Sequence, residues 1–67
     1  MYYIKDWFLN KNFTQNEAYI IRLAQAGGEL YMIRETEKAL QLRAESDFGN
    51  LVFWVPKSCT VSEEEVL

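Results

Sequence analysis

The chain has no histidine, a single cysteine and a single proline, and each of these scarcities excludes something. Cys59 has no second cysteine with which to form an intramolecular disulfide, and a lone thiol is typical of a reducing compartment. Without histidine, a structural zinc site would need Cys59 and carboxylates, which are a poor tetrahedral ligand set. No G-x-x-x-x-G-K-[ST] or G-x-G-x-x-G element occurs. We therefore expect no disulfide, no metal site and no cofactor.

Long apolar runs are missing as well. No stretch approaches the roughly 18 apolar residues of a membrane span. The start MYYIKDWF lacks the apolar run and the small-residue cleavage site of a signal peptide. These features predict a cytoplasmic protein without membrane contact.

What is present is enough apolar side chain for one small core. The 67 residues are 49% hydrophobic and 15% aromatic, which predicts a single domain of marginal stability. A partner subunit is the form of support that remains once disulfides and metals are set aside. The net charge of -3 is accounted for by Glu63, Glu64 and Glu65, so the body is balanced. It therefore lacks the basic excess that usually drives binding to nucleic-acid phosphates.

The clearest local pattern is Thr14-Gln15-Asn16-Glu17, a capping box that predicts a helix over residues 15–26. Gly27 is expected to take the left-handed conformation that ends it. Apolar residues surround most of this helix, which predicts that it is mostly buried. Residues 3–10 carry apolar side chains at helical spacing and predict a first helix, with an N-terminal strand as the alternative.

After the glycine pair, three β-rich segments at residues 29–35, 38–45 and 50–55 predict a three-stranded antiparallel meander. The fold class is therefore α+β, with the helices packed on the sheet. The middle strand alternates apolar and polar residues, whereas both outer strands carry apolar side chains on both faces. Pro56 ends the third strand. Residues 62–67 predict either a short acidic helix that Val66 and Leu67 anchor or a frayed tail.

Catalytic groups are hard to find. Ser58 and Cys59 have Lys57 as their only neighbouring base, and adjacent side chains point in different directions. The carboxylates that could act in pairs flank predicted turns, where solvated charges are common. We therefore expect that the protein is not an enzyme.

The predicted sheet offers a binding surface instead. If the polar face of the middle strand carries Arg43, its neighbours on that face include Tyr31 and Trp54 in one register. An arginine between two aromatic rings is a platform that binds peptides and also stacks unpaired bases. A slip of one residue exchanges the faces, and the N-terminal segment or a second copy of the chain could instead cover this face as ordinary core.

One sequence pattern extends across the predicted strands: Glu35-Thr36-Glu37-Lys38-Ala39, followed later by Trp54-Val55-Pro56-Lys57-Ser58. It resembles short uncharacterised proteins of phages and other bacterial mobile elements, which share an "ETEKA…WxPKS" pattern. The resemblance covers about residues 35 to 58 and implies a small accessory protein, with no catalytic residue to carry over. Lys57 and Ser58 then lie on a loop just past the sheet edge, where binding contacts are common.

Two functions are consistent with these features. The first is a protein-interaction module of a phage or mobile element, such as an inhibitor or adaptor of a host nucleic-acid machine, with a protein partner or a second copy of itself. Its predicted binding residues are Tyr31, Arg43, Trp54, Lys57 and Ser58. The second is a single-stranded nucleic-acid-binding protein that uses the aromatic rings and is assisted by nearby basic residues; the balanced charge of the body disfavours it.

Overall fold

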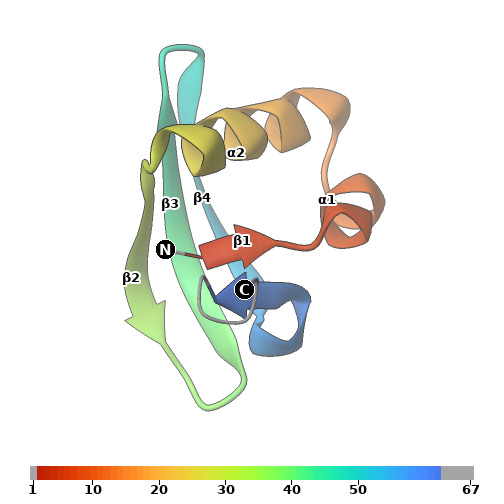
Figure 1. The fold of residues 1–67 in the computed structure, drawn as a ribbon, viewed down its shortest axis with the longest axis vertical. Helices are drawn as coiled ribbons and strands as arrows, with labels where there is room; N and C mark the ends of the chain where they lie inside the picture. Colours follow the sequence, from red (N-terminus) through yellow and green to blue (C-terminus); the bar gives the residue numbers. More distant parts are fainter. Residues whose placement is uncertain (1, 63–67) are drawn as a thin grey trace.

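The structure, a computed structural model, describes residues 2–62 and has the predicted α+β class. Two helices are followed by a three-stranded antiparallel sheet, and a second, two-stranded sheet joins the two ends of the described chain (Figure 1). The elements in order are β1 (Tyr2–Ile4), α1 (Asp6–Asn12), α2 (Gln15–Gly27), β2 (Leu30–Glu35), β3 (Ala39–Ser46), β4 (Gly49–Pro56), the 3-10 helix η1 (Lys57–Cys59) and β5 (Thr60–Ser62).

Helix α2 begins where its capping box predicts. The Glu17 N–H donates to Thr14 Oγ1 at 3.2 Å, and the Thr14 N–H donates to Glu17 Oε1 at 2.9 Å. Two of the N–H groups that a helix start leaves without partners are thereby satisfied. At the other end, Gly28 rather than Gly27 takes the left-handed conformation, with φ at 74°. The predicted terminator is therefore displaced by one residue, and the helix runs one residue further.

The prediction that α2 is mostly buried is wrong. Only one stripe of the helix, formed by Ala18, Ile21 and Ala24, is buried. Tyr19 lies on the other side and is half-exposed. The helix packs on a single face of one sheet, so only the side chains of one stripe can reach the core.

The N-terminal segment divides between the two structures predicted for it. Residues 2–4 form strand β1, and the helix expected over 3–10 begins at Asp6 and continues to Asn12. The short apolar run was compatible with strand and helix, and the choice follows from pairing with β5, which lies far away in the sequence. The Ile4 N–H also donates to Gln25 Oε1 of α2 at 2.8 Å, which ties β1 to that helix.

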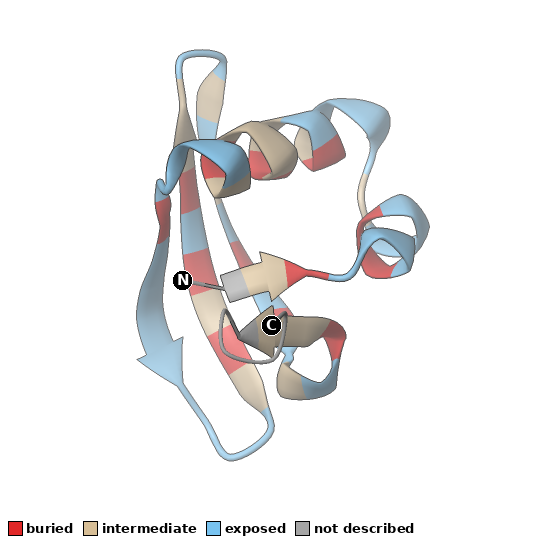
Figure 2. Ribbon diagram, viewed as in Figure 1, coloured by how far each residue is buried: buried red, intermediate tan, exposed pale blue. Residues whose placement is uncertain are grey.

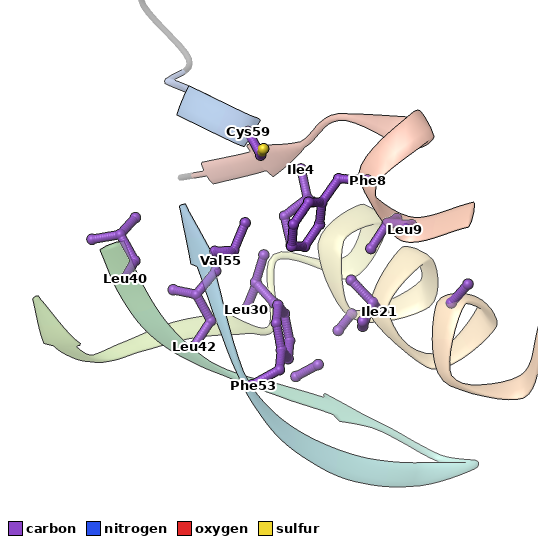
Figure 3. Close-up of a cluster of buried hydrophobic side chains, with 13 residues drawn as sticks. Ile4, Phe8, Leu9, Ile21, Leu30, Leu40, Leu42, Phe53, Val55 and Cys59 are labelled. Atoms are coloured by element: carbon purple, nitrogen blue, oxygen red, sulfur yellow. The ribbon is translucent and has the colours of Figure 1, made fainter. Parts of the chain in front are cut away.

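The main sheet has the order β2-β3-β4, with both pairings antiparallel. The register places Leu42 opposite Phe53 and Leu40 opposite Val55, and these side chains lie on the side of the sheet that α2 and the β1–β5 pair cover (Figure 3). We call this side of the sheet the inner face. Figure 2 shows buried positions alternating with more exposed ones along β3.

The two-stranded sheet of β1 and β5 lies on the inner face, next to α2 (Figure 1). It contributes Ile4 to the core, and η1 contributes the buried thiol of Cys59 (Figure 3). The N-terminal segment therefore covers the inner face of the main sheet and not the opposite one. The predicted acidic helix or tail beyond Ser62 lies outside the described residues. Neither helix within residues 2–62 is both long enough and apolar enough to span a membrane.

Candidate binding face on the sheet

The side of the main sheet that faces away from α2 carries a group of large side chains. Strand alternation places several residues there, and we call the side that carries them the outer face; its central members are Tyr31, Gln41, Arg43, Val52 and Trp54. Arg43 lies at the centre, directly opposite Tyr31 on one side and Val52 on the other. Trp54 is opposite Gln41 and is therefore a diagonal neighbour of Arg43. The three residues predicted for a platform thus share one face, although Val52 and not Trp54 is the direct partner of Arg43.

The apolar side chains of the outer face remain open to solvent. Tyr31 is 42% exposed, Trp54 46% and Val52 51%. On the inner face of the same strands, Leu42 and Val55 are both 0% exposed. No element within residues 2–62 covers the outer face, so its aromatic rings are available for contact.

Arg43 is held in place by two neighbours. Its guanidinium carbon lies 5.6 Å from the centroid of the Tyr31 ring, which is cation–π distance. Its Nε lies 2.6 Å from Glu45 Oε2 on the same strand. The side chain is still 47% exposed, so both contacts are solvated and each stabilises by no more than about 1 kcal/mol. They orient the arginine without burying it.

Strand β2 extends the outer face to the edge of the sheet. The register shifts between Met32 and Arg34, which is a β-bulge at Ile33, and beyond it Arg34 pairs with Gln41. From Tyr31 onward every residue of β2 is exposed (Figure 2). Arg34 makes no ion pair with any other part of the chain between residues 2 and 62. An accessible strand edge with one free cation therefore adjoins the outer face.

Lys57 and Ser58 do not join the other predicted binding residues. Lys57 Nζ lies 2.5 Å from Glu35 Oε2, and Glu35 pairs with Leu40 in the sheet, on the inner-face side. The Ser58 hydroxyl is 3.9 Å from the sulfur of Cys59. The structure therefore separates the predicted set into the outer-face group and two residues in η1.

Residues of the "ETEKA…WxPKS" pattern join the β2–β3 turn region to the segment that follows β4. The Lys57 N–H donates to the Lys38 carbonyl at 2.8 Å, and the Glu35–Lys57 ion pair connects the same two segments. The Thr36 hydroxyl accepts the Ala39 N–H at 3.0 Å within the β2–β3 turn. Trp54 is different because its half-exposed ring makes no hydrogen bond or aromatic pair with residues 2–62.

Metal ligands do not converge in the part of the chain that the structure describes. Within residues 2–62 no group of three or more cysteine, aspartate or glutamate side chains is placed to hold a metal ion. Glu35, Glu37 and Asp47 beside the turns are exposed, as expected from their positions, whereas Glu45 is partly buried and paired with Arg43.

A second apolar surface was missed by reasoning from sequence. Phe48 in the β3–β4 turn is 69% exposed and lies against Tyr19 of α2, with 5.7 Å between the ring centroids. The available signal was an aromatic residue inside Ser46-Asp47-Phe48-Gly49, where turn chemistry calls for polar residues and glycine. Its helix partner could not be identified without the three-dimensional arrangement.

No protein-family model, curated protein or solved structure matches this chain. The resemblance to phage and mobile-element proteins stays a prediction, and the function is inferred from the two surfaces themselves.

Proposed function

We propose that the protein is a protein-binding module whose outer face holds an extended segment of a partner. The observation that carries this proposal is a cluster of exposed apolar side chains around an oriented arginine, on a sheet whose other face is filled. Trp, Tyr and Arg are the residue types enriched at the energetic centres of protein interfaces. Tyr31, Arg43 and Trp54 bring all three types together within one sheet face.

The size of the face favours a segment over a whole globular surface. Three strands about 4.8 Å apart, and eight residues rising about 3.4 Å each, span an area of roughly 14 by 27 Å, or about 400 Å². A standard interface between globular proteins buries about 800 Å² on each partner. A second copy of this chain would therefore need further surface to form a stable dimer, whereas an extended peptide fits the area available.

The charges favour a segment that carries acidic as well as apolar side chains. Arg34 and Arg43 are the cations at this face, and Glu45 is already paired with Arg43. The exposed edge of β2 also leaves backbone groups free to pair with an added strand. An extended partner can place apolar side chains on Trp54 and Tyr31 and a carboxylate near Arg34.

Fluorescence offers a direct test because the chain has only two tryptophans, Trp7 and Trp54. A Trp7→Phe variant leaves Trp54 as the single reporter on the outer face. Linear peptides selected from a random library against this variant should carry apolar and acidic residues and should shift or quench Trp54 emission to saturation. They should bind at least tenfold more weakly when Tyr31→Ala is added. Peptides that bind without changing Trp54 emission would overturn the proposal.

Single-stranded nucleic acid is the second candidate, favoured by the two rings and the arginine on one sheet face. The same Trp7→Phe variant tests it by titration with a short oligodeoxythymidine at low salt. We expect no saturable quenching, because the basic excess that drives phosphate binding is missing from the body. Saturable quenching that is lost on Arg43→Gln and weakens steeply with salt would replace the peptide proposal with the nucleic-acid one.

A further inference from the structure

The second apolar surface, formed by Phe48 and Tyr19, lies at the end of the β3–β4 hairpin above α2 (Figure 1). We call it the hairpin surface. Phe48 is the most exposed of the large hydrophobic residues described, at 69%, and Tyr19 is 51% exposed. The two rings pack on each other at 58° and leave their remaining surfaces in water. This surface is separate from the outer face, because α2 packs on the inner face of the sheet.

The turn holds Phe48 in a defined position. The Ser46 hydroxyl donates to the Gly49 carbonyl at 2.9 Å and accepts the Phe48 N–H at 3.2 Å. Gly49 has φ at 137°, and a Cβ there would lie 3.6 Å from Ile20 Cδ1. A positive φ disfavours every other residue type, so glycine is what permits this turn against the helix. The aromatic ring is thus preorganised, which lowers the entropy lost on binding.

Two hollows flank Phe48. One, of about 310 Å³, is lined by Asn16, Tyr19, Ile20 and Phe48. The other, of about 250 Å³, is lined by Leu23, Gly27, Glu29, Glu45, Ser46, Asp47 and Phe48. Pockets for drug-sized ligands start at about 300 Å³ and are largely enclosed. Two shallow hollows of this size suit two side chains of a docked protein segment better than one small molecule.

The charges around the smaller hollow favour a cationic side chain as its occupant. Among residues 2–62, three carboxylates line it, and of these only Glu45 makes an ion pair, with Arg43. No lysine or arginine lines the hollow, and the last turn of α2, which ends there at Gly27, has no basic residue. The carboxylates, the negative end of the helix dipole and the face of the Phe48 ring all attract a cation. None of the described residues that line the larger hollow is charged.

We propose that the hairpin surface docks a protein segment through one arginine or lysine and one nearby apolar side chain, since Phe48 lines both hollows. The cation enters the hollow between Phe48, Glu29 and Asp47, and the apolar side chain covers Tyr19 and Ile20. This occupant is opposite in charge to the acidic segment proposed for the outer face. The chain then has two docking surfaces of different specificity, which suits an adaptor between two proteins.

The test uses the peptide Gly-Leu-Gly-Arg-Gly, blocked at both ends, titrated into isotopically labelled protein and followed by amide chemical shifts. The control peptide replaces arginine by citrulline, which has nearly the same shape without the charge. We expect saturable shifts at Gly27, Glu29, Asp47 and Phe48 with the arginine peptide, and at least fivefold weaker binding with citrulline. The arginine-dependent shifts should diminish as salt is raised.

Variants of the protein complete the test. Glu29→Gln combined with Asp47→Asn should weaken the arginine peptide by at least fivefold, because both side chains are exposed and their loss leaves the fold intact. Trp54→Ala should leave this binding unchanged. Equal shifts with citrulline, an unaltered affinity in the double variant, or no saturable shifts at these residues would each overturn the proposal. Binding that is lost on Trp54→Ala would assign the peptide to the outer face instead and would equally overturn it.

Discussion

The two faces of the β2–β3–β4 sheet are built from the same strands and differ in what their apolar residues do. On the inner face, Leu40, Leu42 and Val55 are 0–2% exposed beneath α2 and the β1–β5 pair. On the outer face, Tyr31, Val52 and Trp54 are 42–51% exposed. Apolar composition alone therefore does not identify core, because the outer apolar residues keep 42–51% of their surface in water. Exposed apolar side chains gathered on a strand surface increase the risk of aggregation, so their presence supports the binding role proposed for this face.

The largest expected effect is a loss of stability when a buried side chain of the inner face is truncated. Leu42→Ala removes a fully buried side chain and should cost about 3 kcal/mol of unfolding free energy. Small domains have only about 3–5 kcal/mol in total, so this variant should be largely unfolded at 37 °C. Urea unfolding followed by circular dichroism measures the loss. The matched control, Val52→Ala on the outer face, should cost less than about 1 kcal/mol. Similar costs for the two variants would remove the distinction between the faces.

The next effect should appear in binding and not in stability. Trp54→Ala should weaken selected outer-face peptides by about 2 kcal/mol, roughly thirtyfold, as truncation of an interface hot spot does. Its free energy of unfolding should change by less than about 1 kcal/mol, because the ring is half-exposed. Isothermal calorimetry with the selected peptide, alongside urea unfolding, measures both quantities. A variant that keeps its affinity but loses its stability would assign Trp54 to the core.

A smaller loss of stability is expected when the N-terminal cap of α2, the helix that packs on the inner face, is removed. Thr14→Ala removes the side-chain acceptor that caps α2 and should cost about 1 kcal/mol. The expected result is a lower urea midpoint with no change in peptide affinity at the outer face. Thr14→Ser keeps the hydroxyl and is the control that should retain most of the stability. An unchanged midpoint in Thr14→Ala would mean that the capping box does not stabilise the helix.

The smallest expected loss of stability comes from breaking the Glu35–Lys57 ion pair, which links the end of β2 to η1. Glu35→Gln breaks an ion pair whose side chains are 37% and 48% exposed, so solvent already weakens it. The cost should be about 0.5 kcal/mol or less, and it should vanish in high salt. Thermal unfolding at low and high salt measures this difference. A cost above about 1.5 kcal/mol would show that the pair closes the sheet more tightly than its exposure indicates.

Local chemistry made part of the fold predictable. The start of α2, the alternation in β3 and the end of β4 at Pro56 each depend on residues close together in the sequence. The pairing of β1 with β5 was not predictable, because a strand of three residues is too short to give a clear pattern and its partner lies far away in the sequence. For the same reason, the sequence could not distinguish the alternative N-terminal strand from a helix.

For the proposed binding face, strand alternation was the only sequence feature that indicated which residues share a face. Alternation allowed Tyr31, Arg43 and Trp54 to share a face in one register only, and the observed pairing decided both that they do and which of them are direct neighbours. Lys57 was grouped with them because it follows Trp54 closely, but its ion pair with Glu35 holds it on the other side. The hairpin surface depends on a turn folding over a helix, and such tertiary contacts leave no periodic signal.

The pairing of β1 with β5 also bears on how fast the chain folds. The hairpins of the main sheet join residues close in sequence, whereas Tyr3 meets Val61 only after almost the whole described chain is enclosed in one loop. Closing that loop costs more chain entropy than closing either hairpin, so we expect the terminal ribbon to form last. During refolding, the β2–β4 hairpins can assemble before β5 docks, and Ile4 then gains its final neighbours only when the ribbon closes.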